Sequence, residues 1–137
     1  MQTTVLEVRT GSREVVHDLT SACARFVAEA SGGGDGLLHV FVPHATAGVA
    51  VMESGDGSDV DLLGALRALL PGDDRWVHRH GSPGHGRDHL LPALVAPYAT
   101  LPVVGGRIEL GTWQSVCLVD TNVDNPVRQV RLSFLAD

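Results

Sequence analysis

Hydrophobic and polar residues alternate near the start of the chain, in the pattern of a strand with one buried face. Over residues 3–9, Leu6 and Val8 fall on one side while Glu7 and Arg9 fall on the other. A period of two predicts a half-buried strand. Six further segments alternate in this way or are wholly apolar, and each is predicted to be a strand: residues 13–18, 37–42, 49–52, 107–110, 114–120 and 127–134.

Three other segments repeat their apolar residues with the period of a helix: residues 21–30, 56–70 and 89–96. Thr20 is of a residue type that caps helices and is placed to begin the first of them. Pro92 falls in the first turn of the third, where proline is tolerated. Because strands and helices do not strictly alternate, the sequence predicts one α+β domain over residues 1–137 with a mixed, largely antiparallel sheet of about seven strands.

Composition and charge narrow the function classes. Hydrophobic residues make up 44% of the chain and charged residues 19%, which excludes a disordered protein. The net charge of −6 argues against nucleic acid or an anionic membrane as a partner. No apolar run approaches the length of a membrane span, and the first residues do not resemble a signal peptide. We therefore expect a cytoplasmic protein, with Cys23 and Cys117 as buried free thiols.

Histidine is the unusual residue type. Residues 78–89 read HRHGSPGHGRDH and hold four of the seven histidines. The glycines and the proline between them allow the backbone to fold several imidazoles toward one point, and neutral imidazole suits zinc and other transition metals. The sequence therefore favours a metal or anion site here over a solvated loop that happens to be rich in histidine.

Three polar residues stand where predicted strands end. His44 follows the apolar run 37–42 and precedes small residues, an arrangement common in binding sites. Glu53 closes the next strand, where it could be a metal ligand, a general base or a charge at the start of a helix. Asp120 closes the strand at 114–120 in the same way.

Trp113 stands in a short segment, LGTWQ at residues 110–114, with Gln114 beside it. A tryptophan next to a glycine kink is typically buried, so we expect Trp113 to anchor the sheet. We also expect Gly111 to adopt a conformation that a β-carbon would strain.

Together these segments, in chain order, resemble one family. The motifs that carry the resemblance are HATAG at residues 44–48, TLP at 100–102, GRI at 106–108, LGTWQ at 110–114 and NPVR at 125–128. On these motifs the chain is similar to the YjbQ family, to which a secondary thiamine-phosphate synthase activity is attributed. The resemblance covers nearly the whole chain.

The resemblance implies a mixed sheet curled around two to three helices, a homotrimer, and histidine-lined sites near the subunit boundaries. The implied reaction joins hydroxymethylpyrimidine diphosphate to thiazole phosphate and releases diphosphate. This sequence departs from the family in its loop, GHGRDH at residues 84–89, where the last two histidines lie two residues farther apart. The departure leaves open which of His78, His80 and His85 takes part.

The resemblance also implies a role for each candidate residue. His44, His80 and His89 are expected to bind a divalent metal, zinc or a similar ion, with magnesium as the alternative. Arg107, Glu53 and Asp120 are the expected catalytic residues. Arg107 would bind phosphate oxygens, and the two carboxylates would orient a histidine or lie beside the metal. The expected contacts to a small phosphorylated substrate come from Thr46, Gln114 and Arg128.

Two alternatives use the same residues. In a metal-dependent phosphoester hydrolase, three histidines would leave a position for water and Glu53 would act as the base. A trimeric metal- or ligand-binding protein would hold the ion without turnover. The sequence does not separate these three functions.

Overall fold

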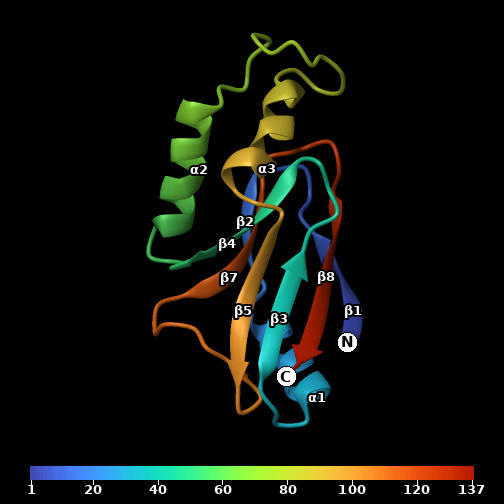
Figure 1. Ribbon diagram of the computed structural model, residues 1–137. Helices are drawn as coiled ribbons and strands as arrows, with labels where there is room; N and C mark the ends of the chain where they lie inside the picture. The colour runs from blue at the N-terminus through green and yellow to red at the C-terminus, as the bar shows by residue number, and fades with distance from the viewer.

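The computed structural model describes residues 1–137, in eight strands arranged as two antiparallel sheets (Figure 1). The larger sheet has the order β1 (Gln2–Arg9), β8 (Val127–Ala136), β3 (Gly36–Phe41), β5 (Tyr98–Val104) and β6 (Arg107–Ile108). The smaller sheet has the order β2 (Val15–Asp18), β7 (Ser115–Asp120) and β4 (Ala47–Met52). The α+β class is therefore confirmed, with two sheets in place of the single sheet that the sequence predicted.

The main core lies between the inner faces of the two sheets. Apolar residues of β1, β3, β5 and β8 meet those of β4 and β7, and helix α1 (Thr20–Ser31) adds Cys23 and Val27. A second apolar cluster forms where α2 (Ser58–Leu69) and α3 (Leu91–Leu94) approach the smaller sheet, through Leu66, Leu91 and Val119. Figure 1 shows α2 standing at the side of the molecule and α1 behind the lower end of the larger sheet.

Most predicted elements are present with small changes at their ends. The predicted helix at 89–96 begins earlier, as the 3₁₀ helix η1 (His85–Leu90), and continues into α3. Thr20 does not cap α1, contrary to prediction. The Asp18 side chain instead accepts a hydrogen bond from the Thr20 N–H (2.8 Å), and the Thr20 hydroxyl accepts one from the Val116 N–H (2.9 Å).

Strand β5 was not predicted, because Pro102 interrupts its pattern. A proline is tolerated in a strand where no partner needs its missing N–H. The carbonyl of Pro102 accepts the Glu109 N–H at 2.9 Å, so its backbone polar side faces β6, which pairs with β5 only from Val103 onward. The strand therefore keeps its bonds to β3 despite the proline.

The prediction for Trp113 was wrong. Its side chain is 73% exposed and anchors nothing in this chain. Gly111 is also not strained, since its φ is not positive and a β-carbon there would meet only the flexible side chain of Gln114. The turn is held by the Gly111 N–H, which donates to Gln114 Oε1 at 2.8 Å.

Replacing Trp113 with alanine is therefore expected to change the free energy of unfolding by less than about 1 kcal/mol, as for most surface positions. Urea unfolding followed by circular dichroism measures this. The matched control is Leu118→Ala in the core, where Leu118 is fully buried and the loss should be about 2–5 kcal/mol. A loss at Trp113 as large as at Leu118 would contradict the exposed position.

No helix of the structure is long and apolar enough to cross a membrane.

Candidate metal centre

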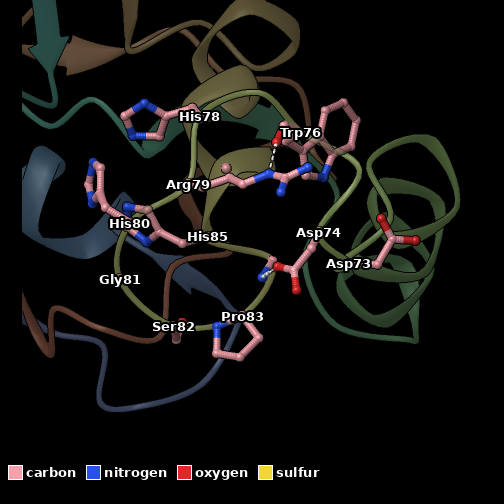
Figure 2. Close-up of a pocket in the computed structure, with 12 residues that line it drawn as sticks. Asp73, Asp74, Trp76, His78, Arg79, His80, Gly81, Ser82, Pro83 and His85 are labelled. Atoms are coloured by element: carbon pink, nitrogen blue, oxygen red, sulfur yellow. Dashed lines mark hydrogen bonds between the residues drawn. The ribbon is translucent and has the colours of Figure 1, made fainter.

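Four imidazoles meet above the smaller sheet. His78 and His80 lie in the loop that follows α2, and His85 and His89 lie four residues apart on η1. One ring nitrogen of each lies within 4.8 Å of the corresponding atom of the others. Figure 2 shows the rings of His78 and His80, from the loop, gathered in one region with that of His85, from the start of η1. We call these four residues the histidine group.

The spacing of the rings fits a single metal ion. Four imidazoles around a tetrahedral zinc, with Zn–N bonds of about 2.0–2.1 Å, would place their ring centres about 5 Å apart. The six distances between ring centres in the histidine group run from 4.2 to 6.3 Å. His85 Nε2 and His89 Nε2 are 2.9 Å apart, so two of the donor atoms are already adjacent. The donor set suits zinc or a similar transition metal.

The loop reaches this shape through close backbone contacts. Gly84 has φ +79°, in the left-handed region that favours glycine, and it immediately precedes η1. A β-carbon on Gly86 would lie 2.3 Å from the carbonyl oxygen of His78, so only glycine allows the loop to pack this closely on η1. The indole N–H of Trp76 donates to the carbonyl of Pro71 at 2.9 Å and holds the start of the loop.

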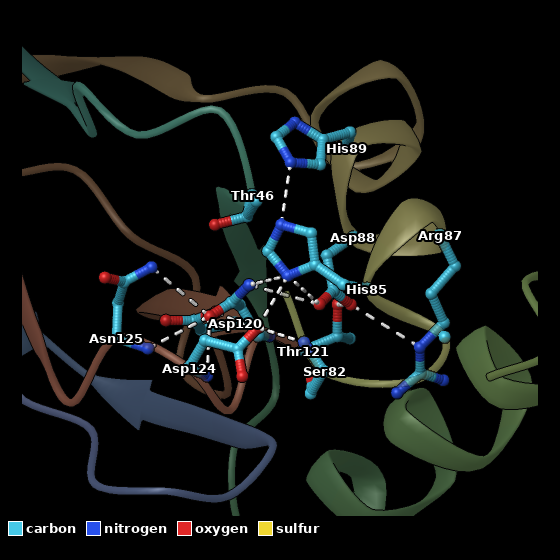
Figure 3. A network of polar contacts seen from close by, with 12 residues as sticks. Thr46, Ser82, His85, Arg87, Asp88, His89, Asp120, Thr121, Asp124 and Asn125 are labelled. Atoms are coloured by element: carbon cyan, nitrogen blue, oxygen red, sulfur yellow. Dashed lines mark hydrogen bonds and ion pairs between the residues drawn. The ribbon is translucent and has the colours of Figure 1, made fainter. Parts of the chain in front are cut away.

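His85 is the buried member of the group, and its other ring nitrogen faces polar side chains of the β7–β8 connection. His85 Nδ1 lies 2.8 Å from Asp124 Oδ2 and 2.9 Å from Asn122 Nδ2 (Figure 3). Asp88 is farther away, at 3.9 Å, and accepts hydrogen bonds from the side chains of Thr121 (2.8 Å) and Asn122 (3.2 Å). These contacts fix the ring of His85 with Nε2 toward the histidine group.

Burial shifts the ionisation of the site in a direction that suits metal binding. It lowers the pKa of His89, and the neighbouring His78, His85 and His80 lower it further, so this ring stays neutral with a free lone pair. Burial also raises the pKa of the Asp88 carboxyl.

A second polar feature lies next to the histidine group. Arg128 Nε donates to Asp120 Oδ2 at 2.5 Å, and Arg128 Nη2 donates to the Thr46 hydroxyl at 3.2 Å. Asp120 is 0% exposed and Arg128 is 2% exposed, so the carboxylate is fully buried and Arg128 reaches the cavity with only a small part of its surface. Thr46 and Arg128 line a cavity of about 260 Å³, together with His44, Ala45, Asn125, Val127 and three members of the histidine group, His80, His85 and His89.

The histidine group also borders another cavity, of about 330 Å³, on the loop side (Figure 2). Its lining includes Asp74, Arg79 and Ser82, with Trp76 as its one large hydrophobic residue. His80 and His85 line both cavities, so the group stands between them.

Comparison with known proteins identifies the family. The model of the family described as UPF0047 protein YjbQ-like matches residues 4–137. The chain belongs to this family. It is 60% identical over 135 residues to a UPF0047 protein of Mycobacterium tuberculosis, with 98% of each chain covered, and 32% identical over 129 residues to one of Methanothermobacter thermautotrophicus, with 93% and 87% covered.

Solved structures agree with this assignment. A hypothetical protein of Aeropyrum pernix K1 superposes with a TM-score of 0.89 at 34% identity, over 100% of both chains. A conserved hypothetical protein of Thermus thermophilus gives 0.76 at 36% identity, over 96% of this chain and 99% of the other. The YjbQ-like fold inferred from the sequence motifs is thereby confirmed.

Within this YjbQ-like chain, some predicted site residues meet and others do not. His80 and His89 are in the histidine group, and Thr46 and Arg128 share its cavity. His44 lies on the cavity wall beside the group, and its Nε2 accepts the Gln129 N–H at 2.9 Å. Burial, followed by the charge of Arg128, lowers the pKa of His44.

Glu53, Gln114 and Arg107 lie away from the histidine group. In the smaller sheet Ala47 pairs with Asp120 at the cavity end, and Met52 pairs with Ser115 at the other end. Glu53 and Gln114 extend from that other end, about 20 Å along the six-residue strands. Arg107 is exposed on β6, which pairs with the end of β5 far from Tyr98.

Sequence reasoning missed the residues that support His85. Asp124, Asn122 and Asp88 surround its ring but carried no expected role. A signal was present: residues 120–125 read DTNVDN, a run of polar residues directly after a buried strand. Such a run at a strand end is as informative as the single His44.

Proposed function

We propose that this protein is a metal-dependent enzyme acting on a small phosphorylated substrate, by transfer of the thiamine-phosphate synthase type. The observation that carries the proposal is the histidine group, whose four donor atoms fit one divalent ion, preferably zinc. His78, His80, His85 and His89 would hold this ion. When bound, it would supply positive charge beside a diphosphate leaving group, which a chain of net charge −6 has to provide locally.

The cavity wall supports binding of a phosphate group. The Thr46 hydroxyl and the Arg128 guanidinium lie side by side there, and both are donors suited to phosphate oxygens. Asp120 is fully buried, so its proposed role is to hold the Arg128 guanidinium in place rather than to touch the substrate. His44 would present a neutral ring to the same cavity, since its pKa is lowered.

Hydrolysis with Glu53 as the base has less support. Within one chain Glu53 is at the end of β4 opposite the histidine group, so it cannot deprotonate a water bound there. The transfer reaction does not need this base. The reaction would take place in the cytoplasm, which the two free buried thiols of Cys23 and Cys117 support.

Assembly into a homotrimer would give a reason why Arg107 and Gln114 lie far from the histidine group of their own chain. The outer face of the larger sheet carries no helix, and it exposes apolar side chains from four strands: Val5, Leu37, Tyr98, Val104 and Leu135. An apolar patch of this kind marks an interaction surface. A neighbouring chain could then place its Arg107 or Gln114 near the histidine group.

Sedimentation equilibrium is expected to give a mass about three times the 14.5 kDa of one chain at micromolar concentrations. Replacing the paired apolar residues Leu37 and Leu135 with serine should shift the mass toward that of one chain, because the change makes the exposed face polar. Mutation of the exposed Val77, which lies in the loop, is the control. A mass of 14.5 kDa for the wild type would contradict the trimer.

The experiment for the function uses protein purified without a histidine tag. Elemental analysis should find about one transition metal per chain. Incubation with hydroxymethylpyrimidine diphosphate and thiazole phosphate should give thiamine phosphate, and a chelator should abolish the product. A parallel incubation with p-nitrophenyl phosphate tests the hydrolase. If the protein contained metal but catalysed neither reaction, it would be a metal-binding protein, and the proposal of an enzyme would be wrong.

A further inference from the structure

His85 Nδ1 has two polar neighbours, which favour opposite protonation states of this nitrogen. Asp124 Oδ2, at 2.8 Å, is an acceptor and favours a proton on Nδ1. Asn122 Nδ2, at 2.9 Å, is a donor and favours an unprotonated Nδ1. A neutral imidazole carries one proton, so a proton on Nδ1 leaves Nε2 free and a proton on Nε2 blocks it.

The orientation of the Asn122 amide is set by the backbone. Asn122 Oδ1 accepts the N–H groups of Asp124 (2.9 Å) and Asn125 (3.1 Å), so the amide nitrogen must face His85. One of its hydrogens reaches Asp88 Oδ2 at 3.2 Å, and the other points at His85 Nδ1. The amide cannot turn over to offer its oxygen to the ring without losing both backbone hydrogen bonds.

Asp124 is the stronger of the two neighbours. Asp124 Oδ2 accepts a hydrogen bond from the Ser82 backbone N–H at 3.2 Å, which holds this carboxylate oxygen beside the ring. Hydrogen bonds to a charged acceptor are about twice as strong as those between neutral groups. Asp88, the other carboxylate nearby, is too far from Nδ1 to act as the acceptor.

We infer that Asp124 is a positioning residue for the histidine group: it holds the proton of His85 on Nδ1, against the competing Asn122 amide, and thereby keeps His85 Nε2 free to bind the metal. This inference rests on the proposed metal centre. In the metal-free protein the 2.9 Å contact between the two Nε2 atoms then has His89 as the donor and His85 as the acceptor, and metal binding through His89 Nε2 requires the His89 proton to move to Nδ1.

Loss of the Asp124 charge has a specific consequence. Without it, the Asn122 amide is free to donate to Nδ1, and the single proton of His85 moves to Nε2. The ring would keep its place, because its contacts on η1 are unchanged, but it would no longer offer a lone pair to the metal. Residues that orient a ligand in this way typically change metal affinity about 10–100-fold.

The test combines zinc affinity with the tautomer of His85. Zinc affinity is measured by competition with a chromophoric chelator, and the tautomer by long-range ¹H–¹⁵N NMR of the metal-free protein. Wild type should show His85 protonated on Nδ1. Asp124→Ala should show a proton on Nε2 and a zinc affinity about 10–100-fold weaker, with a smaller loss in Asp124→Asn, whose amide oxygen can still accept from Nδ1.

The matched control is Asp73→Ala, which removes a carboxylate beside the loop-side cavity that lies against Arg75 rather than a histidine. Its zinc affinity should stay within about twofold of wild type, because exposed ion pairs contribute little. Equal zinc affinity in Asp124→Ala and wild type, or His85 protonated on Nε2 in wild type, would overturn the inference. If wild type bound no zinc, the proposed metal centre would fail, and the NMR tautomer would still decide the role of Asp124.

Discussion

Replacing His89 with alanine is expected to weaken zinc binding by more than about 100-fold, a larger loss than for a residue that only orients a ligand. His89 Nε2 lies next to His85 Nε2 in the histidine group, and the lowered pKa of His89 keeps its ring neutral, so one ring nitrogen has a free lone pair. Thiamine-phosphate formation should disappear with the metal. The folded state should lose no more than about 1 kcal/mol, because His89 is only partly buried on η1 and lies outside both apolar clusters.

His17→Ala is the matched control for this prediction. His17 is exposed on β2, in the smaller sheet, and belongs to no group of ligands. It should change neither zinc affinity nor turnover. His44→Ala separates binding from catalysis, since His44 faces the cavity beside the group and should affect turnover more than zinc affinity. Full metal content in His89→Ala would place the metal elsewhere.

The local elements were predictable because their patterns are carried by neighbouring residues. The alternation at residues 3–9 became β1, and the apolar run at 37–42 became β3. The division into two sheets was not predictable in this way. It depends on β8 pairing with both β1 and β3, contacts between residues at least 90 positions apart, which no local pattern contains.

The candidate site was predictable in part for the same reason. The density of histidine at 78–89 is visible in the chain and led to His80 and His89. The partners of His85 come from the β7–β8 connection, and Asn122 is 37 residues away in sequence. Only the packing of η1 against that connection brings them together. For Glu53 the prediction of a strand end was right, but the prediction of a site residue was not supported within one chain. That strand end lies opposite the end that borders the histidine group.

The largest loss of stability is expected from Arg128→Met. The Asp120 carboxylate is fully buried and receives two hydrogen bonds from the Arg128 guanidinium, at 2.5 and 3.3 Å. Methionine fills similar space but carries no charge, so the carboxylate would remain buried and unpaired. Breaking a buried ion pair from one side costs about 3–5 kcal/mol of folding free energy. Urea unfolding measures the loss, and the variant should also lose the contact to the Thr46 hydroxyl that borders the cavity.

Two further variants show whether the unpaired charge is the cause. In the double variant Asp120→Asn with Arg128→Met, no charge is left buried, so part of the lost stability should return even though the ion pair is still absent. Arg9→Met removes an arginine from the exposed pair with Glu7 and should cost under about 0.5 kcal/mol. If the double variant were no more stable than Arg128→Met alone, the cost would lie in packing around the methionine. Recovery of stability in the double variant would instead show that the isolated Asp120 carboxylate causes the loss. Arg128, which borders the cavity beside Thr46, would then also be needed to balance a buried charge in the core.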